Sequence, residues 1–527
     1  MVMSILHGGT LTESIVAALS YDEGAPLSYL SDYFALALLI FGCGYMALRR
    51  RVTLRTMYVV IFSLFVYYKM AGVALLLLLG VAISDYLIAW GVAHRLKQGR
   101  SPRGWVALSA VINIAILTYF TATNFIVHTI NDLYGSGTLN WEPVVKVVGV
   151  SFFVFQSLAY VIDVSRGTIA PLRRFESYLF LLSFFPKLVC GPLVKARDFI
   201  PQIESPEVGV SREDMGRGVT LIARGLVKFM LLSQVIGTLF VGPAFEGTMG
   251  DGGMVALLAI YGFTMQLYCD FSGFSEFAIG LALMMGFRLP DNFDAPYKAA
   301  TITEFWRRWH ISLSSWLREY LYISLGGNRK GRLRTYLNLF LTMFLGGLWH
   351  GVSLPFMAWG ALHGIALALH KVWLAVVPGA KSVGEQMRPL WRLLATLLTL
   401  HIVAFGWLLF NAPDMATVGR MLGSIANNMS LSELGELDTL SLVAVGLIVV
   451  GYMLHYMPRS ANAWLQRSVT RSGFVGQWVV IVATLWCVGE CNALLGEYRR
   501  ADVTARVERT GEAAESAGGG LPAYGAF

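Results

Sequence analysis

Two tryptophan–histidine pairs are the residues of this sequence best suited to carry out chemistry. Trp309-His310 and Trp349-His350 lie in one aromatic and basic stretch, residues 301–351, within a very apolar chain. Histidine is the usual side chain for moving protons near neutral pH, so either imidazole could serve as a general base or acid. Because an ionisable group is costly inside an apolar protein, both histidines are candidates for function.

The sequence around the second pair predicts an accessible imidazole. Residues 336–350 predict a short apolar helix that cannot fully cross a bilayer, since about 20 residues span the hydrocarbon. On a helix, Gly346 and Gly347 lie directly beneath the side chain of His350, and Gly351 follows it. Because glycine has no side chain, we expect open space where a substrate can reach the ring. The alternative is close helix packing around a hydrogen-bonded histidine.

The first pair lies in a stretch, residues 301–325, that predicts one amphipathic helix. Thr301 and Glu304 have the spacing of a capping box at its start. Large apolar residues then recur at three- and four-residue steps on one side: Trp306, Trp309, Leu313, Trp316, Leu317 and Tyr320. Such a face is typical of a membrane-interface anchor or of a wall of a site. The basic segment 328–331 that follows could contact an anionic ligand or form a positively charged cytoplasmic loop.

Motifs of other chemistries are missing from the sequence. It contains no G-x-S-x-G nucleophile elbow, no H-E-x-x-H metal motif, no P-loop and no G-x-G-x-x-G. Its five cysteines have no metal or disulfide spacing, so we expect no metal site. His363 and His370, seven residues apart on one helical face, remain second-rank candidates.

The elements that must position these residues are membrane helices. The 527 residues are 56% hydrophobic and 14% charged, whereas about a quarter of the residues in soluble domains are charged. The apolar runs are long enough for helices and lack the alternation of barrel strands. The sequence therefore predicts an all-α polytopic membrane protein with roughly 11–13 transmembrane or re-entrant helices.

Two of the apolar runs depart from a simple crossing. The run 254–287 is too long for one crossing and contains Asp270 and Gly273, so it predicts two helices or a re-entrant pair. The run 177–194 contains Pro186 and Gly191-Pro192, so it predicts broken, re-entrant backbone. Two sets of polar residues in apolar runs predict helix–helix hydrogen bonds: Gln266, Tyr268, Asp270, Ser272 and Ser275, and then Tyr160, Asp163 and Arg166.

The charge distribution predicts the orientation of the chain. The net charge of +8 comes from Lys and Arg at the ends of apolar runs, which is typical of a membrane protein and does not indicate a nucleic-acid partner. The basic segment 288–334 should be cytoplasmic, and the acidic segment 412–439 should face the opposite side, with the N-terminus outside. One membrane domain is expected over residues 1–496, followed by a disordered polar tail over residues 497–527.

Several motifs together resemble a known family. TEFWRRWHISLSSWLREYLYISLGGNR, followed by LTMFLGGLWHG, is similar to the membrane-bound O-acyltransferases, specifically to the bacterial alginate O-acetyltransferase branch. Supporting segments are Ser151–Gly167, Phe184–Ile203 and Leu267–Tyr297. The resemblance covers residues 33–411 and is strongest over 267–351.

The resemblance implies a helical funnel in the inner (cytoplasmic) membrane of a bacterium. It implies transfer of acetyl from a cytoplasmic thioester, with acetyl-CoA as the donor substrate and no tightly bound cofactor. The essential histidine of the family is the one in LWHG, here His350, and its second signature position is the one in WRRWH, here His310. The acceptor would be an exported polysaccharide such as alginate or cellulose. Besides membrane lipid, the implied partners are a periplasmic acetyltransferase or acceptor protein and polysaccharide export machinery.

Other functions stay open at this point. An acyltransferase acting on teichoic acid or peptidoglycan belongs to the same family, although the teichoic-acid D-alanylation relatives lack the WLREYLYISLGGNR continuation. A proton-coupled transporter could use the histidines and Asp270 as a proton relay. A non-catalytic scaffold of a secretion complex is the third alternative.

Overall fold

The computed structural model describes residues 19–29, 31–135, 147–377 and 388–510. Every regular element in these ranges is a helix, and no strand occurs in them. The chain divides into two compact units, residues 1–209 and 210–525. The division falls near the polar segment that follows residue 204, and the single membrane domain expected over residues 1–496 stays a prediction.

Eight helical stretches of the described residues are long and apolar enough to cross a membrane. They are Val52–Lys97, Arg103–Tyr134, Arg212–Glu246, Gly253–Met284, Leu354–Val376, Pro389–Asn411, Thr439–Tyr456 and Gly473–Arg500. Two shorter apolar helices, Asp32–Leu48 and Val150–Ser165, accompany them. These helices confirm the predicted all-α polytopic class.

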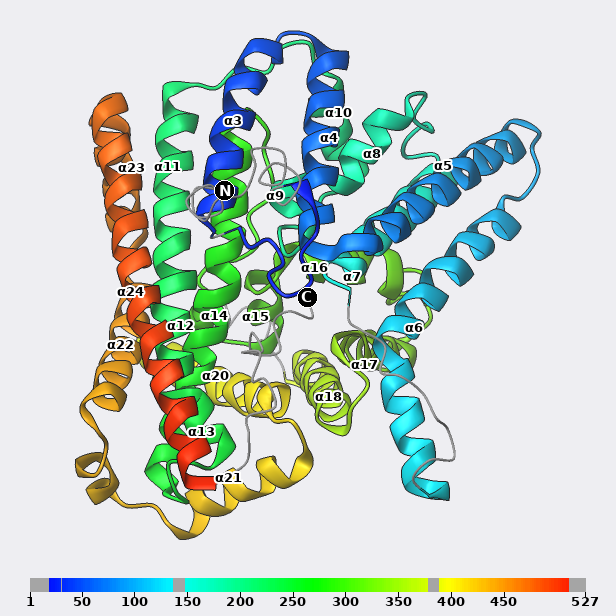
Figure 1. Cartoon of the computed structure of the whole chain (residues 1–527). Coiled ribbons are helices and arrows are strands. Elements are labelled where there is room, and N and C mark those ends of the chain that lie inside the picture. The colour runs from blue at the N-terminus through cyan, green and yellow to red at the C-terminus, as the bar shows by residue number, and fades with distance from the viewer. Residues whose placement is uncertain (1–18, 30, 136–146, 378–387, 511–527) are drawn as a thin grey trace. The chain divides into compact units, whose positions relative to one another are not determined.

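In its described residues, the first unit consists of helices and the segments that connect them (Figure 1). They are α3 (Asp32–Leu48), α4 (Val52–Ala71), η1 (Gly72–Ala74), α5 (Leu75–Lys97), α6 (Arg103–Tyr134), α7 (Val150–Ser165), α8 (Phe175–Ser183), α9 (Phe185–Leu188) and α10 (Ala196–Glu204). The helix predicted to be broken over 177–194 is indeed interrupted, between α8 and α9. At the break, the amide of Phe185 donates to Ser63 Oγ at 3.1 Å, and Lys187 Nζ donates to Gln156 Oε1 at 2.7 Å. Side chains therefore cover the interrupted backbone, as apolar surroundings require.

The second unit contains all the candidate site residues. Its helices up to the long central one are α11 (Arg212–Leu226), η2 (Val227–Ser233), α12 (Gln234–Ile236), η3 (Gly237–Val241), α13 (Gly242–Glu246) and α14 (Gly253–Met284). The following ones are η4 (Pro296–Lys298), α15 (Ile302–Arg308), α16 (Ile311–Trp316), η5 (Leu317–Tyr322), α17 (Arg332–His350), α18 (Leu354–Val376) and α20 (Pro389–Asn411). The last are α21 (Met415–Asn427), η6 (Leu431–Gly435), α22 (Thr439–Tyr456), α23 (Arg459–Arg471) and α24 (Gly473–Thr510).

The last helix changes the predicted boundary of the tail. α24 continues from Gly473 through Thr510, so residues 497–510 are helical and the prediction of disorder is wrong for them. Disorder was predicted there because the composition is polar. A helix that has already formed can nevertheless extend at little cost in free energy, because its unfavourable step is nucleation. Residues 511–527 lie outside the described residues.

The prediction of two helices or a re-entrant pair over 254–287 is wrong, because α14 is one continuous helix of 32 residues. At a rise of about 1.5 Å per residue its length is about 48 Å. Two of its glycines, Gly273 and Gly280, allow close packing against α11 (Figure 1). A Cβ at Gly273 would lie 2.7 Å from the carbonyl oxygen of Gly225, and one at Gly280 would lie 2.7 Å from that of Gly218. The glycines thus allow two backbones to touch and do not end the helix.

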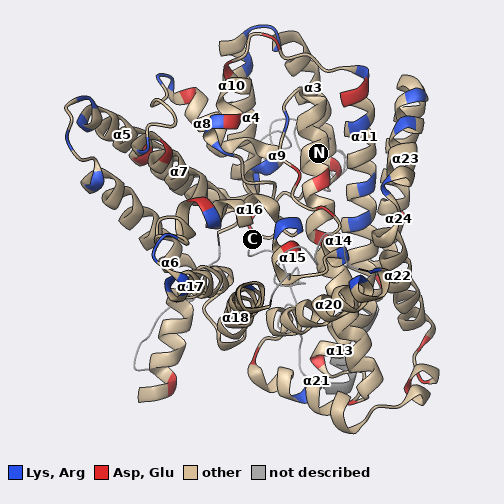
Figure 2. Cartoon of the chain, turned by 180° about the vertical axis from the view of Figure 1, so that it is seen from behind, with Lys and Arg blue, Asp and Glu red and all other residues tan. Residues whose placement is uncertain are grey.

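The two ends of α14 differ in charge. Near its C-terminus, Arg288 pairs with Asp214 at 3.3 Å, and Figure 2 shows further Lys and Arg along α11 and α23. At its N-terminus, Glu433 accepts hydrogen bonds from the amides of Met254 (3.0 Å) and Val255 (3.2 Å). A carboxylate is favourable there because the helix dipole is positive at its N-terminus. Residues of the predicted basic and acidic segments thus lie at opposite ends of one long helix, while their sides of the membrane stay a prediction.

We expect Gly225→Ala to destabilise the second unit. The new Cβ would lie 2.5 Å from the carbonyl oxygen of Gly273, so α11 and α14 must separate. Overpacking of this kind costs about 1–3 kcal/mol. Thermal unfolding of the purified protein in detergent measures the effect. Gly446→Ala in α22 is the matched control, since no atom lies within 4 Å of its new Cβ, and it should leave the unfolding temperature unchanged or raise it. Equal behaviour of the two variants would contradict this account of the contact.

Candidate active site

The segment that follows α14 folds back along the middle of that helix. The hydroxyl of Tyr297 donates to the carbonyl oxygen of Thr264 at 2.7 Å, and the amide nitrogen of Asn292 donates to Ser275 Oγ at 3.1 Å. Thr264 and Ser275 are both interior residues of α14. Part of the stretch that the charge pattern placed in a cytoplasmic loop therefore packs against the centre of the unit.

The single helix predicted over 301–325 is wrong, because the chain breaks at His310. α15 ends at Arg308, α16 begins at Ile311, and His310 has a φ of 42°. Left-handed backbone costs a residue with a Cβ roughly 1–2 kcal/mol, so the surroundings must hold it in place. The three- and four-residue spacing of the aromatic residues continues across the break, which is why the sequence pattern does not reveal it.

The predicted capping box at the start of α15 is half right. Thr301 Oγ1 accepts the amide of Glu304 at 3.1 Å, as an N-cap residue should. The Glu304 carboxylate accepts the amide of Ala300 at 2.9 Å, one residue before the expected one.

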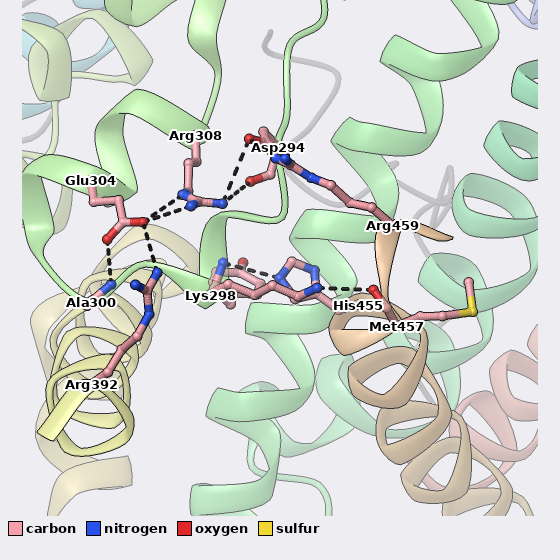
Figure 3. A network of polar contacts seen from close by, with 10 residues as sticks. Asp294, Lys298, Ala300, Glu304, Arg308, Arg392, His455, Met457 and Arg459 are labelled. Atoms are coloured by element: carbon pink, nitrogen blue, oxygen red, sulfur yellow. Dashed lines mark hydrogen bonds and ion pairs between the residues drawn. The ribbon is translucent and has the colours of Figure 1, made fainter. Parts of the chain in front are cut away.

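A network of ion pairs fixes α15 to its neighbours (Figure 3). Arg308 lies between two carboxylates: its Nη2 contacts Glu304 at 2.8 Å, and its Nη1 contacts Asp294 at 3.8 Å. Arg459 of α23 also pairs with Asp294, at 2.8 Å, and Arg392 of α20 lies 3.9 Å from Glu304. Arg308 is only 22% exposed, so its two pairs are less screened by solvent than surface pairs are. The network connects α15 with the segment after α14, with α20 and with α23.

His310 is a buried imidazole with an available nitrogen. It is 2% exposed, and its Nε2 atom has no hydrogen-bond partner among the described residues. Its ring meets that of Phe271 of α14 edge to face at 4.5 Å. Burial lowers the pKa of His310 well below its usual range, and the nearby His350 lowers it further. His310 is therefore neutral near pH 7 and lies within electrostatic reach of His350.

His350 ends α17 inside an aromatic enclosure. Its ring lies edge to face with Trp359 at 5.2 Å and with Phe410 at 5.0 Å, and it lies 4.4 Å from the ring of Trp349. The side chain is only partly exposed. α18 contributes Trp359 and α20 contributes Phe410, so three helices place this imidazole.

The expectation that three glycines open space beside His350 is wrong for two of them. A Cβ at Gly347 would lie 2.5 Å from the carbonyl oxygen of Phe356, and one at Gly351 would lie 2.7 Å from the Phe356 ring. These two glycines therefore allow the first turns of α18 to pack closely against the end of α17. This is the alternative of close helix packing. Only Gly346 has room, since its Cβ would be 3.7 Å from Leu317 Cδ1.

A continuous layer of aromatic rings lies between the two histidines. Trp309, next to His310, packs against Trp407 at 4.8 Å. Trp407 stacks on Trp359 at 6.0 Å, and Trp359 contacts His350. Trp309, Trp359 and Trp407 are each at most 4% exposed. Four of the six residues of the apolar face of 301–325 are buried in protein, namely Trp309, Leu313, Leu317 and Tyr320, which favours a site wall over a membrane-interface anchor.

The second-rank histidines differ in their surroundings. His363 is fully buried, lies 5.0 Å from Trp359 and 5.1 Å from Trp306, and belongs to the aromatic layer. His370 Nδ1 lies 2.7 Å from Thr303 Oγ1, which connects α18 to α15. The two histidines therefore border the site on the side of α15.

Two polar residues of α14 make the hydrogen bonds that were predicted between helices. Ser233 Oγ donates to Asp270 Oδ1 at 3.2 Å, and Lys228 Nζ donates to Ser272 Oγ at 3.3 Å. In the first unit, the Tyr160 hydroxyl accepts the amide of Leu172 at 2.8 Å, but Leu172 lies in the loop between α7 and α8, so this bond does not join two helices. No group of three or more His, Cys, Asp or Glu side chains that could hold a metal ion occurs within the described ranges.

Known proteins include clear relatives of this chain. The sequence profile described as "MBOAT, membrane-bound O-acyltransferase family" matches residues 167–390. "Probable alginate O-acetylase AlgI" of Pseudomonas syringae pv. tomato is 38% identical over 389 residues, which is 72% of this chain and 71% of the relative. This chain belongs to the membrane-bound O-acyltransferase family. As a family member it is an acyltransferase, and both of its candidate histidines lie within the matched residues.

Other members of the family carry different names. "Peptidoglycan O-acetyltransferase" of Helicobacter pylori is 30% identical over 72% of this chain and 76% of the relative. "Teichoic acid D-alanyltransferase" of Streptococcus thermophilus is 28% identical over 51% of this chain and 69% of the relative. All of these names describe transfer of an acyl group, so the similarity defines the reaction class more closely than it defines the acceptor.

Sequence reasoning missed two features of this MBOAT site. Asn292 approaches the backbone just after His310, and the only signal was a polar residue next to Phe293 in an aromatic and Pro-rich stretch. Trp407 completes the aromatic layer, although it comes from a helix that carried no motif. Both are distant in sequence from His350, and only the fold brings them near it.

We expect Gly347→Ala to reduce acyl transfer strongly and Gly346→Ala to be tolerated. A Cβ at Gly347 would force α17 away from α18 and displace His350, whereas one at Gly346 makes an ordinary contact. A displacement of about 1 Å can lower a rate roughly a hundredfold. Transfer rates of the two purified variants, normalised to folded protein, test this. Equal rates for the adjacent variants would contradict the packing described for α17.

Proposed function

We propose that this protein is an O-acetyltransferase that moves acetyl across the inner membrane for O-acetylation of an exported polysaccharide. The donor is a cytoplasmic thioester, acetyl-CoA, and alginate is the first candidate acceptor, followed by cellulose. One observation carries the proposal: in a member of an acyltransferase family, the fold joins buried His310 and partly exposed His350 through one continuous set of packed aromatic rings. The identity to relatives named as alginate O-acetylases supports the choice of polymer.

In this proposal His350 is the general base of the transfer. Its imidazole takes the proton from an acceptor hydroxyl as the oxygen attacks the carbonyl carbon of the thioester. The carbon–sulfur bond then breaks, and the proton passes to the departing thiolate. Base catalysis contributes roughly 10²–10⁴-fold, and positioning of the two reactants supplies further acceleration. The aromatic surroundings favour this role because they exclude water from the reacting groups.

His310 has a supporting role in the reaction. A neutral imidazole can polarise the acetyl carbonyl, bind the donor or orient His350. The unpartnered Nε2 atom supports direct contact with a substrate group, since a buried nitrogen without a partner costs free energy that a bound substrate would recover.

The proposed route runs from the cytoplasm to the periplasm, with the N-terminus outside. The opposite charges at the two ends of α14 support this orientation. Between α20 and α22 the chain holds only α21 and η6, which is too little to bind a long polymer. We therefore include a periplasmic acetyltransferase or acceptor protein, together with polysaccharide export machinery, as partners that receive the acetyl group.

Peptidoglycan and teichoic acid are the alternative acceptors within this family. The relative named peptidoglycan O-acetyltransferase matches 72% of this chain, which keeps peptidoglycan as an alternative acceptor. Reconstitution in vesicles with labelled acetyl-CoA separates the classes: label on an acceptor supports the enzyme, solute flux supports a transporter, and neither supports a scaffold. Offering alginate, cellulose and peptidoglycan fragments with the periplasmic partners then distinguishes the acceptors.

We expect His350→Ala to remove O-acetyl from the polymer while the protein remains in the membrane at its normal level. The reason is the loss of base catalysis, roughly 10²–10⁴-fold. The measurement is ester-linked acetyl per sugar, with immunoblotting of the membrane fraction.

His401→Ala is the matched control for this experiment. His401 is exposed on α20, and its Nδ1 lies 2.7 Å from the carbonyl oxygen of Leu397 in its own helix. The His401→Ala protein should acetylate the polymer at the wild-type level. Normal acetylation by the His350 variant would rule out the proposed base.

A further inference from the structure

The helix that begins after His310 has an unusual N-terminus. His310 is the N-cap residue of α16, yet its side chain makes no capping hydrogen bond. An N-cap side chain ordinarily accepts the amide of the second or third helical residue, here Ser312 or Leu313. An imidazole used in that way could not also face a substrate. Another group must therefore satisfy the first amides of α16.

Asn292 supplies that cap from a distant part of the chain. Its Oδ1 atom accepts the amide of Ser312 at 3.2 Å and the hydroxyl of the same residue at 2.9 Å. Its backbone carbonyl oxygen accepts the amide of Ile311 at 2.9 Å. The first two amides of α16 are thus satisfied by one residue that lies outside the helix.

Asn292 is itself held rigidly. It is 1% exposed, and its amide nitrogen donates to Ser275 Oγ of α14 at 3.1 Å. Close by, the amide of Asp294 donates to the carbonyl oxygen of Arg308 at 3.0 Å, and Arg308 Nη1 donates back to the Asp294 carbonyl oxygen at 3.1 Å. Figure 3 shows the Arg308 side chain beside Asp294, and the two bonds together fix the segment after α14 against the end of α15.

Backbone strain is concentrated at the same place. Among the described residues, only Ala295 and His310 combine a Cβ with a positive φ, at 44° and 42°. Ala295 directly follows Asp294, and His310 directly precedes Ile311, so both lie beside the hydrogen bonds described above. Strained backbone persists where the surroundings over-determine it, and it is often found at functional sites.

We propose that Asn292 is a positioning residue for the transfer reaction: it caps α16 in place of His310, holds His310 in its left-handed conformation and frees the imidazole for the substrate. The inference rests on the role of His310 in the proposed function. Asn292 does not touch the reacting atoms, so it acts only through the placement of His310.

The chemistry of the cap defines three variants. Asn292→Ala removes the acceptor for Ser312, so α16 loses its cap and His310 can leave its conformation. Asn292→Asp keeps an acceptor oxygen, and Ser275 can reverse its bond and donate its hydroxyl proton to the new carboxylate. Ser275→Ala removes only the acceptor of the Asn292 side-chain amide nitrogen and leaves the cap oxygen in place. The expected order of activity is wild type, then the Asp variant, then Ser275→Ala, then Asn292→Ala.

The test uses the full-length protein in vesicles with labelled acetyl-CoA. For Asn292→Ala we expect kcat to fall by about ten- to a hundredfold with a smaller change in KM, because a displaced catalytic group costs rate more than binding. Amide hydrogen exchange in residues 309–316 should become faster in the same variant. Asn292→Asp should recover most of the rate and of the protection.

Asn113→Ala is the matched control for general destabilisation. Asn113 is also fully buried, and its amide nitrogen donates to Asp85 Oδ2 at 2.8 Å in the other unit. This control should lower the unfolding temperature without changing kcat of the folded protein or exchange in residues 309–316. If Asn292→Ala fails to fold, Ser275→Ala still tests the proposal, with the same changes at smaller size.

Two results would overturn the inference. One is an Asn292→Ala or Ser275→Ala protein with wild-type kcat and wild-type exchange. The other is an Asp variant as inactive as the Ala variant. Failure of the proposed function is distinguishable, because the wild-type protein would then transfer no acetyl, while faster exchange in Asn292→Ala would still identify the cap.

Discussion

The site of this protein depends on one constraint: backbone that leaves a helix inside an apolar protein must find a partner for every polar group. The segment between α14 and α15 meets this constraint with three sets of hydrogen bonds. Tyr297 bonds to Thr264, and Asn292 bonds to Ile311 and Ser312. Asp294 and Arg308 bond to each other. A buried amide left without a partner costs about 1–3 kcal/mol. Each contact that satisfies the backbone therefore also restricts where His310 can lie.

The aromatic layer gives the two histidines a common environment. Trp309, Trp407 and Trp359 pack in sequence from one histidine to the other and are almost fully buried. Such a layer keeps water away and keeps the imidazoles neutral, the form in which a histidine can accept a proton. Close backbone packing at Gly347 and Gly360 brings α17 and α18 near enough for Trp359 to reach His350. Helix packing and site chemistry are thus parts of the same arrangement.

Much of this could be predicted from the sequence, and the errors share a cause. The helical class and most helix positions follow from apolar length, and both histidines were identified from their neighbours. The break at His310, the continuity of α14 and the filled space at Gly347 were not predicted. In each case a glycine or an aromatic spacing has two local interpretations, and only a contact with a distant helix selects one. Local pattern contains no information about that contact.

The sequence by itself determined the membrane class, the family motifs and the choice of two candidate histidines, because apolar length and residue type are properties of the chain alone. Tertiary structure alone decided which residues surround them. Asn292 lies 18 positions before His310, and Trp407 lies 57 positions after His350. Their contacts arise because segments far apart along the chain pack to bury apolar surface and to pair buried polar groups. Such packing is a property of the folded chain, so no local stretch of sequence reveals it.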